Sequence, residues 1–232
     1  MAETIALWGF PINDELHFDA QETVKKIQND CGKGIKGLNA EAANVIVKLT
    51  HHGLEHYYKR PTEIVPIPPV MKKTADGGIK VVMSAVQLVI KQFFKKRNDN
   101  ELKQLSQLLQ QMLWLKPENE VPHLVFVVHD DLHQRAIILI NQVRTDNNTH
   151  TYIDDVISTL CELVELSIAN YYHEPTNKVE MGNITKKTAD MGMVQAEKSI
   201  QKLINKLLRE VNHKQLVELS YHLESMIHSR VA

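Results

Sequence analysis

A block whose two lysines and threonine could bind an anion occurs twice in this chain, as Lys-Lys-Thr-Ala-Asp at 72–76 and again at 186–190. Both copies fall in the first turns of a long helical pattern, where backbone N–H groups are free and the helix dipole favours negative charge. Two lysines and a threonine at such a place would hold a phosphate or a carboxylate. The block also has a structural explanation, because Asp76 lies four residues after Lys72 and three after Lys73 and can pair with either. We favour the structural explanation and keep the anion site as the alternative.

A second repeated block, Tyr-Tyr-x-x-Pro-Thr at 57–62 and 171–176, precedes each lysine block by one loop. Pro61 and Pro175 are expected to end a helix, since proline lacks the N–H that a helix interior requires. One tyrosine of each pair should face the core, where a buried hydroxyl needs a hydrogen-bond partner. Each half would then hold a polar pocket suited to a small anion. The candidate ligand-binding residues are Tyr57, Tyr58, Lys72, Lys73, Thr74 and Asp76 in the first half, and Tyr171, Tyr172, Lys186, Lys187, Thr188 and Asp190 in the second.

The remaining polar side chains do not form a recognisable catalytic or metal-binding set. The sequence Asp-x-Leu-His recurs at 14–17 and 130–133, a spacing that a metal can use and that also fits an N-cap aspartate, which we favour. His52 and His56 have helical spacing, but the equivalent positions of the second half are not histidines. No glycine-rich phosphate loop or nucleophile elbow occurs. We therefore expect no catalytic residue, no metal and no cofactor, and the balance is against an enzyme.

Both blocks belong to a longer internal repeat. Residues 57–116 align with 171–230 at a constant offset of 114, and 19 positions are identical. An earlier match, at an offset of 116, relates 14–17 to 130–133. A repeat of this length predicts an internal duplication in which the two copies share one architecture.

Helical periodicity dominates each copy, whereas strand signals are nearly absent. The apolar spacing predicts two helices in each copy, over about 39–58 and 69–97 in the first and about 151–172 and 183–211 in the second. The next helix should begin with a capping box in both copies, because Asn98 precedes Glu101 by three residues and Asn212 precedes Gln215 by three. We assign the apolar run 124–128 either to the start of a helix or to a buried extended segment that precedes one.

We therefore predict an all-α fold made of two tandem four-helix bundle-like repeats. Their bounds are 1–116 and 117–232, and a pseudo-twofold axis should relate them. The repeats would form either two separate bundles or one eight-helix body.

The composition limits the class of partner. With 232 residues, of which 43% are hydrophobic, the chain can bury a substantial core, and its net charge of -1 gives no field that attracts nucleic acid or an anionic membrane. The sequence contains no apolar run of about 18 residues that would cross a membrane and no signal-peptide pattern at its N-terminus. Its two cysteines match no metal spacing and suit a reducing compartment, so we expect a cytoplasmic protein.

Two functions follow from these observations. The favoured one is a non-enzymatic helical module that binds a protein partner or self-associates as a homo-oligomer. The alternative is a protein or enzyme that binds a small phosphate or carboxylate metabolite through the two repeated blocks. The first predicts an exposed apolar patch, whereas the second predicts that tyrosine, lysine and aspartate side chains converge on a cavity.

Overall fold

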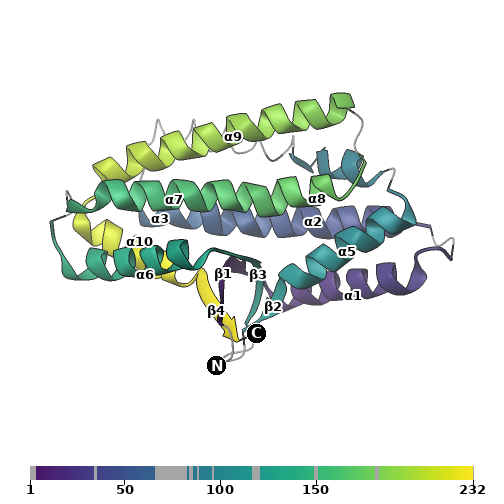
Figure 1. Cartoon of the computed structure of the whole chain (residues 1–232), viewed down its shortest axis with the longest axis horizontal. Helices are drawn as coiled ribbons and strands as arrows, with labels where there is room; N and C mark the ends of the chain where they lie inside the picture. Colours follow the sequence, from purple (N-terminus) through teal and green to yellow (C-terminus); the bar gives the residue numbers. More distant parts are fainter. Residues whose placement is uncertain are drawn as a thin grey trace.

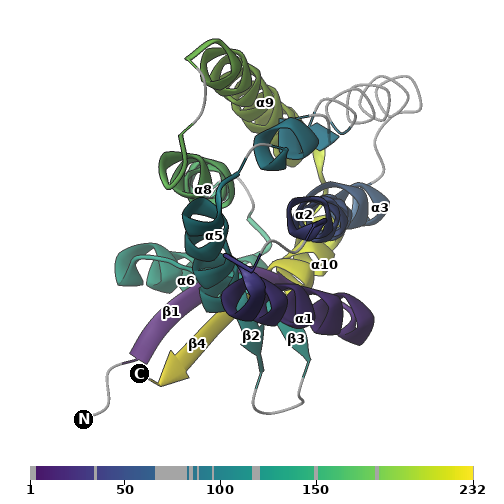
Figure 2. The same cartoon turned by 90° about the vertical axis from the view of Figure 1, so that its right-hand side faces the viewer.

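The computed structural model describes residues 4–33, 36–65, 83, 86–87, 89–95, 97–116, 121–148, 151–180 and 183–231. Helices make up most of this part, and they lie on one side of a small four-stranded sheet (Figure 1). Turned by 90°, the molecule shows the sheet at its base (Figure 2). The helices α1 (Asp14–Asp30), α5 (Asp99–Met112) and α6 (Asp130–Thr145) contact its strands. The mainly helical class predicted from the sequence is confirmed, but the sheet was not predicted.

The sheet is antiparallel, with its strands in the order β2-β3-β1-β4. The bounds are Thr4–Pro11 for β1, Leu113–Leu115 for β2, Pro122–Val127 for β3 and Ile227–Val231 for β4. The run 124–128, assigned to a helix start or an extended lead-in, lies mostly in β3. Both central strands are buried along most of their length. They therefore lack the alternation of polar and apolar residues by which a strand is recognised in sequence.

The centre of the sheet is the pair β1–β3, in which Gly9 stands opposite Val125. These residues are 116 positions apart, which is the offset of the earlier repeat match. Glycine is required here, because a Cβ at this position would lie 2.2 Å from the carbonyl oxygen of Leu124. The close approach of the two central strands thus depends on one residue without a side chain.

Each half places the same order of helices after its central strand. In the first half these are α1 (Asp14–Asp30), α2 (Leu38–Leu54), the π-helical turn η1 (Glu55–Lys59) and α3 (Arg60–Ile64). In the second half they are α6 (Asp130–Thr145), α7 (Ile153–Ile168), the π-helical turn η3 (Ala169–His173) and α8 (Glu174–Asn177). The helices predicted over 39–58 and 151–172 are confirmed.

The expectation that Pro61 and Pro175 end these helices is wrong. The backbone stays helical from η1 into α3 and from η3 into α8, with the proline at the second position of each short helix. The π-helical turn widens the helix just before the proline, which lacks an N–H and crowds the preceding carbonyls. The Thr62 hydroxyl donates to the Lys59 carbonyl at 2.9 Å, and Thr176 bonds to its own preceding turn in the same way.

The last helices of the two halves begin as the sequence predicts. Their bounds are Asp99–Met112 for α5 and His213–Glu224 for α10. Asn98 and Glu101 form a complete capping box, as do Asn212 and Gln215. The long helix α9 spans Asn183–Glu210 and confirms the prediction over 183–211. Of the helix predicted over 69–97, the described residues 83, 86–87 and 89–94 are helical.

The N-caps expected at Asp14 and Asp130 are displaced by one residue. Asn13 caps α1, and its side chain accepts a hydrogen bond from the Leu16 N–H at 2.7 Å. His129 precedes α6 without a side-chain cap bond. Both aspartates are instead the first helical residues, where the positive end of the helix dipole stabilises a negative charge.

The hydrophobic core draws on both halves of the chain. The cluster between the sheet and the helices contains Trp8 from β1 and Phe126 from β3. Ile64 of the first half packs against a cluster built from α6, α7, α9 and α10, while Val179 of the second half packs against a cluster of α1, α2 and α5. Each half therefore contributes a residue to a hydrophobic cluster of the other, Ile64 at the end of α3 and Val179 just after α8.

A buried ion pair also joins the halves. The Arg97 guanidinium donates to the Glu101 carboxylate at 2.9 Å and to the Glu180 carbonyl at 2.8 Å. The Glu180 N–H donates to the same carboxylate oxygen at 2.8 Å. The two side chains are only 8% and 11% exposed, so this pair must keep its full set of partners to be stable.

Candidate functional site

The second copy of the polar blocks lies where η3, α8 and the first turns of α9 come together. The first lysine block, Lys72, Lys73, Thr74 and Asp76, lies outside the described residues, as does the side chain of Thr188. The geometry of the candidate site is therefore described in the second half.

The outer tyrosine of the second pair bonds to the aspartate of the lysine block. The Tyr172 hydroxyl donates to Asp190 Oδ1 at 2.9 Å. Burial raises the pKa of this phenol, and its hydrogen bond to the carboxylate raises the pKa further. Tyr172 consequently stays protonated and acts as a fixed donor that ties η3 to α9.

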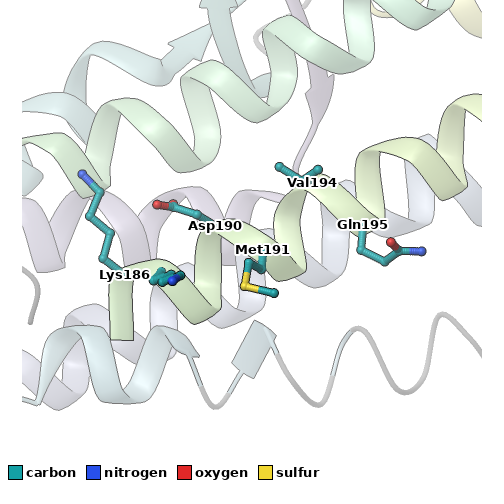
Figure 3. A pocket seen from close by; sticks show the side chains of 6 residues that line it. Lys186, Asp190, Met191, Val194 and Gln195 are labelled. Atoms are coloured by element: carbon teal, nitrogen blue, oxygen red, sulfur yellow. The ribbon is translucent and has the colours of Figure 1, made fainter. Parts of the chain in front are cut away.

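The two lysines of the block behave differently from each other. Lys186 donates to Asn177 Oδ1 at 3.2 Å, across to the end of α8, whereas Lys187 is exposed. Both lie on an open groove of about 520 Å³, whose lining side chains come from α9 (Figure 3). The lining residues are Lys186, Lys187, Asp190, Met191, Val194 and Gln195. Cations, a carboxylate and exposed apolar groups thus share one shallow surface.

The inner tyrosines contact the sheet and not the described residues of the second lysine block. Tyr57 and Tyr171 come together at the centre of the molecule, against the helix-facing side of the sheet. Their rings pack edge-on against Phe10 and Phe126, at centroid distances of 5.5 and 5.2 Å. The Tyr171 hydroxyl donates to the Leu124 carbonyl at 3.3 Å.

The Tyr57 hydroxyl, unlike that of Tyr171, forms no hydrogen bond. It lies near Tyr171, Ser167 and the Trp8 indole N–H, but neither this hydroxyl nor the indole N–H reaches a partner with hydrogen-bond geometry. Burial raises the pKa of Tyr57 to about 12. This phenol therefore remains protonated, and the surrounding packing indicates a structural role.

Of the predicted site residues, the structure brings Tyr172 together with Asp190 and places Lys186 and Lys187 on the same groove. It directs Tyr171 to the sheet instead. Tyr58 is half-buried in η1. The described arrangement in the second half is a set of internal hydrogen bonds beside a shallow surface.

A cluster of imidazoles on the sheet was not found from the sequence. His123 of β3 and His228 of β4 meet edge to face at 4.4 Å, and Trp114 of β2 packs on both rings. His228 Nε2 is buried without a hydrogen-bond partner. Burial lowers the pKa of His228 to about 3, and the nearby His123 and Lys116 lower the pKa in the same direction. Trp114 and His123 come from neighbouring strands, but His228 of β4 is far from both in sequence, so no local spacing could reveal the cluster.

A second imidazole pair links the halves. His56 of η1 and His222 of α10 stack with an interplanar angle of 6°, and the His222 ring bonds to the His56 carbonyl at 2.8 Å. Burial lowers the pKa of His56 to about 4, with a further contribution from His222.

Among the described residues, no group of three or more His, Cys, Asp and Glu side chains is arranged to hold a metal ion. No helix in the described ranges combines the length and the apolar character needed to cross a membrane.

No protein-family model matches this chain, and no curated protein or solved structure matches it either. Function is therefore inferred from the geometry of the side chains.

Proposed function

We propose that this chain is a non-enzymatic helical module that binds a protein partner or self-associates. The observation that carries the proposal is the apolar surface of α9, where Met191 is 66% and Val194 is 46% exposed. These residues are three positions apart, so they lie side by side on one helix face. Covering such a pair would remove apolar surface from water, which is the main driving force of protein association.

The hydrogen bonds within the polar block support the same function. Asp190 accepts from Tyr172 and Lys186 donates to Asn177, so two side chains of the block are engaged within the chain. Side chains held in this way fix α9 against η3 and α8. They act as a support for the exposed face of α9.

To test the proposal, the chain is purified and the stoichiometry of any complex that it forms is measured. Light scattering over a range of concentrations detects self-association, and crosslinking in extracts of the source cells detects a partner. A complex of fixed stoichiometry supports the proposal. A monomer that forms no such complex, and that a small anion stabilises in a saturable manner, contradicts it. The homo-oligomeric state and the cytoplasmic location remain predictions from the sequence.

Binding of a small anionic metabolite is the second candidate, and the groove beside Lys186 and Lys187 favours it. Asp190 lines the same groove and opposes an anion there. To test this candidate, the melting temperatures of the wild type and of the variant Lys187→Met are measured with and without phosphate. A melting temperature that rises with phosphate in the wild type and not in the variant would establish it.

We also propose that an internal duplication produced the chain, with repeats at 1–116 and 117–232 joined in one helical body. The register of the sheet supports this history. Trp8 pairs with Ile227, while Leu124 pairs with Leu113. These two pairs are related by the offsets of 116 and 114 found in the sequence.

Matching side-chain contacts support the duplication further. Lys48 bonds to Asp19 between α2 and α1 at 2.6 Å. The equivalent residues Glu162 and Arg135 bond between α7 and α6 at 2.6 Å, with both charges exchanged. An exchange of this kind keeps the attraction only if the two helix pairs pack in the same way.

A further inference from the structure

Along α9 runs a continuous stripe of five exposed side chains: Lys187, Met191, Val194, Lys198 and Lys202. Their spacing of four, three, four and four residues keeps them on one side of the helix. At about 1.5 Å per residue the stripe is roughly 22 Å long. Its two apolar residues are thus flanked by cations in both directions along the helix.

Two carboxylates near this stripe have hydrogen-bond partners within the chain. Asp190 lines the groove beside Lys187, Met191 and Val194, but it accepts a hydrogen bond from Tyr172. Glu197 lies beside Gln201, which also donates to Glu165 of α7 at 2.9 Å. In the part of the chain that the structure describes, Lys187, Lys198 and Lys202 form no ion pair. The stripe therefore has three lysines and one engaged carboxylate around an exposed apolar centre.

We propose that this stripe binds an acidic amphipathic helix of a partner protein. The proposal rests on the interaction function proposed above and specifies its surface and its partner. Apolar side chains of the partner would cover Met191 and Val194, and carboxylates on either side would meet Lys187 and Lys198. In this mode of recognition an amphipathic helix lies in a groove. Its apolar side chains at helical spacing supply the affinity, and the charges on either side determine the orientation of the bound helix.

Other occupants fit the stripe less well. A second copy placed antiparallel on the same stripe would bring lysines against lysines. A nucleic acid would use the cations but would leave Met191 and Val194 in contact with phosphate and sugar. A membrane-binding helix presents a wide face of large apolar residues, whereas the apolar centre here is two residues wide.

The test uses a fluorescent peptide of about 18 residues, with leucines on one helical face and glutamates flanking them. Its anisotropy is measured against the full-length chain. We expect saturable binding that weakens by at least about tenfold in the double variant Met191→Ser, Val194→Ser. The matched control is Phe18→Ser, because Phe18 is similarly exposed, at 62%, on α1; this variant should bind as the wild type does. Far-UV circular dichroism establishes that each variant is folded.

Charge is tested by reversal. The double variant Lys187→Glu, Lys198→Glu should no longer bind the acidic peptide. It should instead bind a peptide in which lysines replace the glutamates. Equal binding of a scrambled peptide with the same composition overturns the proposal, since an amphipathic helix would not be needed. Displacement of the peptide by duplex DNA or anionic vesicles at matched charge overturns it as well.

These results are separable from the interaction function itself. If the peptide does not bind but the chain still forms a stoichiometric complex that Phe18→Ser disrupts, the α9 surface is wrong and the interaction function stands. If the chain forms neither kind of complex, both proposals fail.

Discussion

Replacing His228 by phenylalanine should make the protein less sensitive to acid. His228 is 6% exposed, and its neighbours in the cluster are His123 and Trp114. Lys116 contributes a positive charge nearby. A protonated imidazole at this place would be buried beside like charge, so the folded state favours the neutral ring. Phenylalanine keeps an aromatic ring at this position and removes its titration.

The magnitude follows from the pKa of His228 in the two states. It is 6.5 for a solvated imidazole and about 3 in the fold. The unfolded chain therefore binds more protons between these values, and the free energy of unfolding falls as the pH drops below 6.5. From pH 7 to pH 4.5 the two pKa values give a loss of about 2.5 kcal/mol. Solvent near the outer face of the sheet screens part of this effect, so we expect between about 1 and 2.5 kcal/mol.

The assay is urea unfolding at pH 7 and pH 4.5, at constant ionic strength, followed by circular dichroism. Other groups titrate in this range in both proteins, so the measured quantity is the difference between the two losses of stability. The wild type should lose more stability than His228→Phe by the amount given above. His129→Gln is the control, because His129 is exposed at the start of α6.

Equal losses of stability in the wild type and in His228→Phe, within about 0.3 kcal/mol, would refute the reasoning. The ring would then be able to accept a proton in the fold without cost. A comparable effect from His129→Gln would show that general surface charge, and not the buried cluster, sets the acid sensitivity.

Three further outcomes are expected. Glu101→Gln should lower the free energy of unfolding by about 3 kcal/mol in urea, since it leaves a buried guanidinium without its carboxylate, whereas the exposed control Glu218→Gln should stay within about 0.5 kcal/mol of the wild type. Tyr171→Phe should cost about 1 kcal/mol through its lost hydrogen bond, while Tyr57→Phe should be nearly neutral because that hydroxyl completes none; the opposite order would contradict the assignment. Gly9→Ala should cost about 3 kcal/mol or more, because the new Cβ overlaps the backbone of β3, and a normal melting temperature would show that the central strands can separate.

Helices were the part of the fold that the sequence could predict, because their information is local. The capping boxes at Asn98 and Asn212 depend on residues three positions apart, and both form as expected. The repeat also fixed which helices should resemble each other. The π-helical turns before Pro61 and Pro175 were missed, because the sequence rule treats a proline as an end. That rule leaves out the possibility that a π-helical turn before the proline lets the helix continue.

The sheet and the candidate site could not be predicted in the same way. β1 and β3 are buried at successive positions along most of their length, so their residues carry no period of two. The pairing of the tyrosines shows a second limit. The sequence indicates that one tyrosine of each pair faces the core, but the contact between Tyr57 and Tyr171 depends on how the two halves dock. Only Tyr172 and Asp190, which the repeated blocks place one loop apart, meet as a local argument suggests.

The place of β1 between β3 and β4 has a consequence for synthesis of the protein on the ribosome. Trp8 pairs with Phe126 on one side and with Ile227 on the other. At roughly 5–20 residues per second, the last partner emerges on the order of ten to forty seconds after β1. Until β3 emerges, about halfway through that interval, this short segment rich in apolar residues has two unpaired edges. Afterwards the edge that pairs with β4 stays unpaired, and unpaired edges favour aggregation with another nascent chain. Efficient production of this protein should therefore depend on early coverage of β1, by a chaperone or by the helices of the first half.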